Sequence, residues 1–290
     1  MGAMVNTAPQ PICNAFTVDV EDYYQVCAFE SHIDPSTWPN FDSRVEASTE
    51  RILGLMDEVG VKGTFFTLGC VAARYPQLVR RIVDNGHELA SHGYAHVRVT
   101  QQDPLSFRHD VDRTRKLLED IGGFPVIGYR ASTYSITQDT LWALEILRET
   151  GHLYSSSIYP IKHDLYGMPE APRFAHRPRA EGVMEIPAAT VEWKGVRWPC
   201  GGGGWFRLLP YPLTVRAIAR INRVDEQPLS FYCHPWEVDP DQPRIEGISM
   251  KTRFRHYLNL HRTLPRLSKL LRDFSWDRMD HVYRQVIHDA

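Results

Sequence analysis

His92 and His96 stand four residues apart in the segment SHGYAH. Two neutral imidazoles at this spacing can bind one divalent metal ion, but such pairs are also common where no metal binds. The spacing alone therefore does not predict a metal site. Carboxylates from other parts of the chain decide the question.

Carboxylates of the required kind follow the apolar segment NAFTV, in the run Asp19-Val20-Glu21-Asp22. On an extended strand Asp19 and Glu21 lie on one face, whereas Asp22 points away unless the backbone bends. A carboxylate after a strand can also cap the next helix, which gives Asp22 a structural interpretation. Glu21 and Asp22 both stay candidates for a metal ligand.

Arg130 and His234 each follow another apolar segment, in VIGYRAS and in FYCHPW. Taken singly, Arg130 could be a surface residue and His234 a core histidine. However, parallel strands of a barrel place their carboxyl ends at one edge, where sites are built. Four such segments end in groups that bind metals or transfer protons, so together they predict a site.

This set of groups has a definite chemistry. Two imidazoles and one carboxylate leave positions on a metal ion open for water and substrate. The ion lowers the pKa of its water and polarises an amide carbonyl. A free carboxylate can remove the water proton, and a distant histidine can protonate the departing amine. The residues therefore predict amide hydrolysis without a covalent intermediate.

Strand-like and helix-like patterns alternate along the chain, which indicates an α/β protein with parallel strands joined by helices. The 290 residues fit one barrel-like domain better than two domains. The tail from residue 251 has an amphipathic helical pattern. We expect a flexible N-terminus at 1–14, a barrel at 15–240 and a helical extension packed on the barrel at 241–290.

Composition excludes several classes of protein. The formal charge of -2 gives no reason to expect nucleic acid as a partner. An apolar stretch long enough to span a membrane is absent from the sequence, as is a signal pattern. We therefore expect the cytoplasm, or the cell envelope if a signal was removed. The sequence does not predict an oligomeric state.

The segments TVDVEDYY, SHGYAH, GYRASTYS and FYCHPW resemble, in this order, the motifs of the NodB-type polysaccharide deacetylases, carbohydrate esterase family 4. The similarity spans about residues 15–240. The segments GGGGWFRLLPY, FYCHPWEVDPDQPR and FRHYLNLHRT further resemble a subgroup from exopolysaccharide and exosortase gene clusters, which has an extra C-terminal segment. The resemblance implies an α/β fold, a distorted (β/α) barrel of the NodB-homology type, with one divalent metal ion, usually Zn²⁺. It also implies removal of N-acetyl groups from acetamido sugars of a polysaccharide, oligosaccharide or lipid-linked precursor.

The resemblance assigns roles residue by residue. Asp19 would be the general base, Arg130 would orient it, and His234 would be the general acid. The metal ligands would be His92, His96 and either Glu21 or Asp22. The backbone near Thr133 and Tyr134 would help to hold the oxyanion. Trp205 and Trp236 could stack on sugar faces or pack in the core, and we retain both with Tyr134 as substrate-binding candidates.

The sequence departs from the family pattern at three points. The usual pair of adjacent aspartates is replaced by Asp-Val-Glu-Asp, and Ser132 stands where the third motif has proline. The fourth motif, an Asp-Trp element, is not found, so the partner that tunes His234 is unassigned. The glycine-rich segment CGGGGWF lacks the Lys-Ser/Thr of a phosphate loop, and we expect it to pass close to a ligand or another backbone.

Two other functions remain open on the sequence. A cyclic-amide hydrolase of the allantoinase type would have a pocket too narrow for a sugar chain. A non-catalytic carbohydrate-binding protein would bind no metal and release no acetate.

Overall fold

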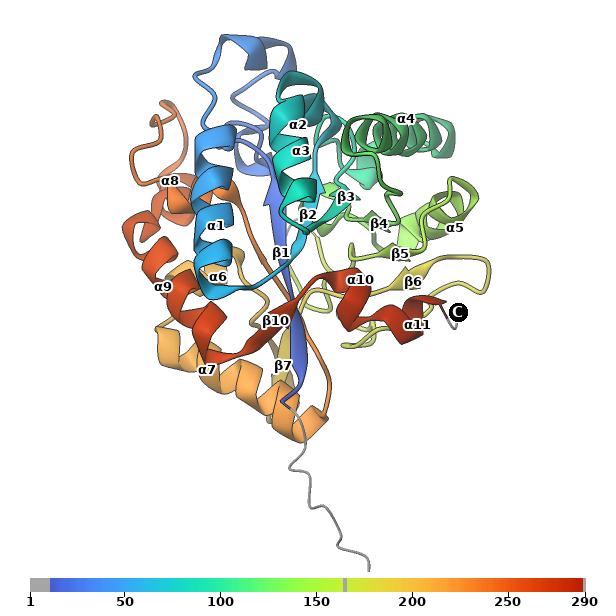
Figure 1. The fold of residues 1–290 in the computed structure, drawn as a ribbon, viewed down its shortest axis with the longest axis vertical. Coiled ribbons are helices and arrows are strands. Elements are labelled where there is room, and N and C mark those ends of the chain that lie inside the picture. Colours follow the sequence, from blue (N-terminus) through green and yellow to red (C-terminus); the bar gives the residue numbers. More distant parts are fainter. Residues whose placement is uncertain (1–10, 164–165, 289–290) are drawn as a thin grey trace, which may run out of the picture.

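A curled parallel sheet of eight strands forms the centre of the computed structural model, which describes residues 11–163 and 166–288 (Figure 1). The strand order is β10-β1-β2-β3-β4-β5-β6, and β9 pairs with β1 as well. This confirms the predicted distorted (β/α) barrel. The strands of the sheet are β1 (Cys13–Val20), β2 (Thr64–Thr67), β3 (Glu88–Ser91), β4 (Gly128–Tyr129), β5 (Tyr154–Ser155), β6 (Met184–Glu185), β9 (Ser230–Cys233) and β10 (Ser275–Asp277).

Helices connect the strands and cover the outside of the sheet (Figure 1). Helix α1 ends at Gly60, which adopts the left-handed conformation with φ of 68°. Pro76 occupies the first turn of α3, where its missing N–H costs no hydrogen bond. The helices are α1 (Val45–Val59), α2 (Gly69–Arg74), α3 (Pro76–Asp84), α4 (Pro104–Gly122), α5 (Trp142–Glu149), α6 (Gly203–Leu208), α7 (Tyr211–Arg220), α8 (Met250–Tyr257), α9 (Leu260–Asp273), α10 (Met279–Val282) and α11 (Arg284–His288). Within the described ranges, the helices are all too short or too polar to cross a lipid bilayer.

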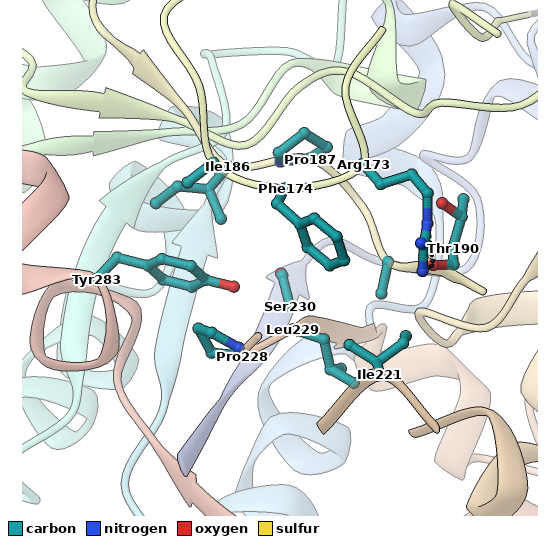
Figure 2. Close-up of a pocket in the computed structure, with 12 residues that line it drawn as sticks. Arg173, Phe174, Ile186, Pro187, Thr190, Ile221, Pro228, Leu229, Ser230 and Tyr283 are labelled. Atoms are coloured by element: carbon teal, nitrogen blue, oxygen red, sulfur yellow. Dashed lines mark hydrogen bonds between the residues drawn. The ribbon is translucent and has the colours of Figure 1, made fainter. Parts of the chain in front are cut away.

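The barrel is open between β6 and β9, which do not pair in the described part of the chain. Figure 2 shows Phe174 and Ile186 facing Leu229 and Ser230 across this opening. The cavity left between them measures 10 Å³, about the least that holds one water molecule. Packed side chains therefore seal the opening in place of backbone hydrogen bonds, and a ligand site has to lie elsewhere.

An antiparallel hairpin, β7 (Thr190–Trp193) and β8 (Val196–Pro199), precedes the glycine-rich segment. Within that segment Gly202 has φ of 120° and bridges Tyr232 of β9, whose N–H donates to the carbonyl oxygen of Gly201 at 2.7 Å. A Cβ atom at Gly202 would collide with the Tyr232 backbone. The expected close approach of two backbones is thus observed, and it fixes the start of α6 against β9.

The C-terminal segment contributes a strand as well as helices. Residues Ser275, Trp276 and Asp277 of β10 pair with Cys13, Asn14 and Ala15 of β1. Cys13 and Asn14 therefore belong to the sheet rather than to a flexible N-terminus, while residues 1–10 of that prediction lie outside the described residues. The predicted helical extension did not include β10, because a strand of three residues is too short to show a period of two.

The core explains why this short strand is held. The Trp276 side chain is 6% exposed and packs edge-on against Phe16 of β1 and Phe231 of β9, each with ring centroids 5.9 Å away. Its indole N–H donates to the carbonyl oxygen of Leu270 in α9 at 3.0 Å. The C-terminal segment thus shares the main hydrophobic core.

We expect Trp276→Ala to lower the free energy of unfolding by about 3–5 kcal/mol, because it removes a buried aromatic ring from the core. Urea unfolding followed by circular dichroism measures the change. Phe124→Ala is the matched control, since the Phe124 side chain is 62% exposed and its removal should cost less than about 0.5 kcal/mol. Equal effects of the two substitutions would mean that the C-terminal segment is not part of the cooperative core.

Candidate active site

Glu21, His92 and His96 form the candidate metal site. One ligand atom from each lies within 4.8 Å of the other two. Glu21 follows β1 directly and His92 follows β3, and these parallel strands, on either side of β2, bring both residues to the same edge of the sheet. The Nδ1 atom of His92 donates to the carbonyl oxygen of Arg130 at 2.8 Å, which leaves the Nε2 lone pair for a cation.

The residues present fit a divalent ion. The Oε2 atom of Glu21 is buried and accepts no hydrogen bond within the described residues, although the Nε2 atom of His96 is 2.9 Å away. Burial alone would raise the pKa of Glu21, but the imidazoles of His96, His234 and His92 lower it below its usual range. Burial lowers the pKa of His92 to about 4. An ionised carboxylate beside a neutral imidazole is the protonation state that a metal requires.

Asp22 is not brought into this cluster, which corrects the second ligand alternative. Its carboxylate accepts hydrogen bonds from the Ser43 hydroxyl at 2.6 Å and from the backbone N–H groups of Arg44 and Val45 at 2.9 and 3.1 Å. The Tyr23 N–H adds a fourth, at 2.9 Å. Because β1 ends at Val20, Asp22 turns toward the start of α1 and caps that helix.

Arg130 lies inside the barrel with no exposed surface. Its Nη1 atom donates to Asp19 at 2.5 Å and to Thr17 at 2.7 Å. Its Nε and Nη2 atoms donate to the Ser156 carbonyl and hydroxyl oxygens, at 3.2 and 3.0 Å, and Nη2 also donates to Ser230 at 3.3 Å. These contacts use all five N–H donors of a guanidinium. The position of Asp19 is therefore fixed by a group that cannot move, as its predicted role requires.

His234 lies beside both Glu21 and Asp19. Its Nε2 atom is 3.7 Å from Glu21 Oε1 and 3.9 Å from Asp19 Oδ2. Burial by itself would lower the pKa of His234, but Glu237, Glu21 and Asp19 together raise it to about 9. The imidazole is thus held in its protonated form near neutral pH, as a general acid requires.

The structure supplies the partner of His234 that the sequence leaves unassigned. The Glu237 carboxylate lies 3.3 Å from His234 Nδ1 and accepts the His234 backbone N–H at 3.0 Å. It is itself held by Arg207 of α6, whose Nε donates to it at 2.8 Å. Glu237 occupies the 3₁₀ helix η7 (Pro235–Val238) three residues after His234, and that spacing was the available signal. Arg207 lies in the GGGGWFRLLPY segment and had no local signal.

The cavity beside the metal site measures 150 Å³. It is lined by Asp19, Glu21, His92, His96 and His234. Its wall includes Tyr134, whose backbone φ of 49° is left-handed, as are those of Thr133 and His96 at 59° and 55°. Such strained residues concentrate at functional sites. The Tyr134 N–H, however, donates to the carbonyl oxygen of Ala131 at 3.0 Å, so in this structure it is not directed at an oxyanion.

The two tryptophan candidates have different positions. Trp236 lines the cavity, but its ring is 6% exposed, stacks between His234 and His256, and donates to Glu21 Oε1 at 3.1 Å. It therefore orients a metal ligand more than it offers a face to a sugar. Trp205 does not line this cavity, because α6 directs it into two neighbouring grooves. Tyr166 and Tyr232 line the cavity instead, and neither was among the substrate-binding residues predicted from the sequence.

Comparison with known proteins agrees with the fold and with the predicted family. Residues 31–154 match the family model described as polysaccharide deacetylase, and residues 156–284 match a domain of unknown function, DUF3473. Residues 31–154 thus carry a polysaccharide deacetylase domain, which confirms the family resemblance drawn from the motifs. The narrower subgroup stays a prediction.

Curated relatives match part of the chain. A peptidoglycan deacetylase-like protein of Gibberella zeae is 34% identical over 155 residues, which are 48% of this chain and 45% of that protein. A peptidoglycan-N-acetylglucosamine deacetylase of Bacillus cereus is 31% identical over 98 residues, which are 33% of this chain and 36% of that protein. The chain thus spans less than half the length of these relatives.

Solved structures match nearly the whole chain. A proposed polysaccharide deacetylase from Mycobacterium smegmatis superimposes with a TM-score of 0.63 at 21% identity, over 98% of this chain and 93% of that one. The PuuE allantoinase superimposes with a TM-score of 0.60 at 15% identity, over 98% and 96%. At these identities the likeness concerns the fold.

The metal ligand can be tested with two isosteric changes. We expect Glu21→Gln to weaken zinc binding by at least about 100-fold, because it removes the ionised ligand. Asp22→Asn should keep the metal and lower the free energy of unfolding by about 1–3 kcal/mol, because it weakens the cap of α1. Calorimetric zinc titration and urea unfolding measure the two effects. Loss of zinc in the Asp22 variant with zinc retained in the Glu21 variant would reverse the assignment.

Proposed function

We propose that the protein is a metal-dependent hydrolase that removes N-acetyl groups from acetamido sugars of a polysaccharide, an oligosaccharide or a lipid-linked precursor. One observation carries the proposal. The ligand set of Glu21, His92 and His96 lies beside a carboxylate, Asp19, and a histidine, His234, whose Nε2 atom is 3.7 Å from Glu21 and 3.9 Å from Asp19. The deacetylase domain over residues 31–154 supports the same chemistry.

The metal site would hold a divalent cation, with Zn²⁺ favoured by its two imidazoles and one carboxylate. When bound, the ion would supply a water of lowered pKa and polarise the acetyl carbonyl. Everything else in the reaction comes from protein groups.

Asp19 is placed to act as the base. Its Oδ1 atom is held by Arg130, so Oδ2 is the oxygen left to accept the proton of the attacking water. On the other side, protonated His234 donates to the nitrogen of the departing sugar amine. Glu237 fixes the His234 ring and stabilises its charge, and Arg207 holds Glu237 in turn. The proposed base, Asp19, and the proposed acid, His234, are thus positioned by two separate buried ion pairs, with Arg130 and with Glu237.

The two rival functions find less support. A cyclic-amide hydrolase needs a closed, narrow pocket, but this cavity has a larger groove next to it, with Tyr166 and Tyr232 in the lining of both. A non-catalytic carbohydrate-binding protein would have no use for Asp19 and His234 beside the ligand set. Burying such charged groups is costly unless each is paired, as they are here.

We expect Asp19→Asn to lower kcat for acetate release by about 10²–10⁴-fold, because it removes the proton acceptor. Acetate is measured with chito-oligosaccharides as substrate, and zinc content should be unchanged. Asp57→Asn, an exposed position on α1, is the matched control and should leave kcat as it is. Full activity of the Asp19 variant would refute its role as the base.

We expect Glu237→Gln to lower kcat by about 10–100-fold with little change in KM, because His234 loses the group that orients it. Glu237→Asp should recover part of the activity. Thermal unfolding of both variants shows how much protein is folded, since Arg207 loses its charged partner in the Gln variant. A kcat per folded molecule equal to that of the unmodified protein would contradict the assignment.

A further inference from the structure

The active-site cavity is the first of three neighbouring hollows, and we call this series the path. The cavity shares Tyr166 and Tyr232 with a groove of 380 Å³ that reaches Phe254 and Leu258 of the C-terminal segment. That middle groove shares Trp205 with another groove, of 350 Å³, between the β7–β8 hairpin and helices α6 and α7. We name this last one the hairpin groove. A long ligand could therefore lie in the cavity and in both grooves.

The hairpin groove is apolar. The strand register places Val191, Trp193, Val196 and Trp198 on one face of the hairpin, and the last three are 56%, 52% and 55% exposed. Val191, Trp193 and Trp198 line the groove. Across it stand Phe206 and Leu209, then Leu213 and Ala217 of α7. Thr214 is the single hydroxyl side chain among the lining residues.

The segments that contribute to the two grooves are rich in basic residues, although the protein as a whole has a formal charge of -2. Residues 244–272 contain eight Lys or Arg residues against one acidic residue, Glu246, a net charge of +7. Residues 203–223 contain four arginines and no acidic residue. Lys251 and Arg255 line the middle groove, between the active-site cavity and the hairpin groove. Both also have contacts within the protein, so their contribution is to the local field.

We propose that the substrate is an acetamido sugar joined through a phosphate to a long hydrocarbon chain, with the chain bound in the hairpin groove. The inference rests on the proposed function, because the sugar has to occupy the site of Asp19 and His234. Along the path, the order of surfaces is polar, then basic, then apolar, which matches the order of groups in such a molecule. The basic middle groove complements the charge of the phosphate.

Further sugar rings fit the hairpin groove less well than a hydrocarbon chain. Each buried sugar hydroxyl needs a hydrogen-bond partner, and leaving one unpaired is costly. The groove offers one hydroxyl and a few indole N–H groups to meet that need. A hydrocarbon chain has no such need and gains from the removal of its surface from water.

The experiment compares two substrates that differ only in the chain. Both carry N-acetylglucosamine 1-phosphate, esterified with a methyl group in one and with a ten-carbon alkyl group in the other. We expect kcat/KM for acetate release to be at least about tenfold higher for the ten-carbon substrate, measured below its micelle concentration with the zinc-loaded full chain.

The double substitution Trp193→Ser with Trp198→Ser should remove most of this preference and leave kcat/KM for the methyl substrate unchanged. Both side chains are more than half exposed, so the fold should tolerate the change. Phe124→Ser, at an exposed site of 62%, is the matched control and should retain the preference. Circular dichroism and unfolding verify that all variants are folded.

The other outcomes separate this inference from the proposed function. Equal kcat/KM for the two substrates, with acetate released from both, would overturn the lipid chain and leave the deacetylase standing. A preference that survives the double substitution would place the chain elsewhere and overturn the hairpin groove. A preference seen only with the substrate in vesicles would indicate membrane docking instead. Failure of the zinc-loaded protein to release acetate from these substrates or from chito-oligosaccharides would refute the proposed function itself.

Discussion

The buried guanidinium of Arg130 is the interaction on which the site depends. Its side chain donates a hydrogen bond to Asp19, and its backbone carbonyl oxygen accepts a hydrogen bond from His92 Nδ1. One residue therefore fixes both the proposed base and the tautomer of a metal ligand. Breaking a buried ion pair by removing one partner typically costs about 3–5 kcal/mol, whereas the intact pair adds little net stability. The pair is thus better understood as a positioning device than as a source of stability.

The sheet explains how this arrangement is possible. Thr17 and Ser230, on neighbouring strands β1 and β9, and Ser156 after β5 all direct oxygen atoms into the barrel interior. An open barrel whose β6 and β9 do not pair leaves these polar groups in a common interior, and Arg130 satisfies them. Without the guanidinium, the hydroxyls of Thr17 and Ser230 would lose a buried partner. Curvature of the sheet and geometry of the site are therefore determined together.

The sequence predicted those parts of the site that depend on short-range patterns. His92 and His96 are neighbours in sequence, and Asp19 and Glu21 share a face because a strand alternates its side chains. The choice between Glu21 and Asp22 could not be made, because it depends on where β1 ends and on the distant start of α1, which Asp22 caps. The contact between Arg207 and Glu237 could not be predicted from the sequence for the same reason. This contact joins α6 to a residue 30 positions later, and no local pattern encodes such a distance.

The site also crosses the boundary between the two matched segments of the chain. The deacetylase match begins at residue 31, after Asp19 and Glu21, and ends at 154, long before His234. The DUF3473 match supplies His234, Glu237 and Arg207. The same segment supplies β9 and β10, which pair with β1 and so fix the strand that precedes Glu21. It also forms the hairpin groove. Neither matched segment contains the complete set of proposed ligands, base and acid. The proposed chemistry requires both, and the strand that carries Asp19 is held in place by the C-terminal end of the chain.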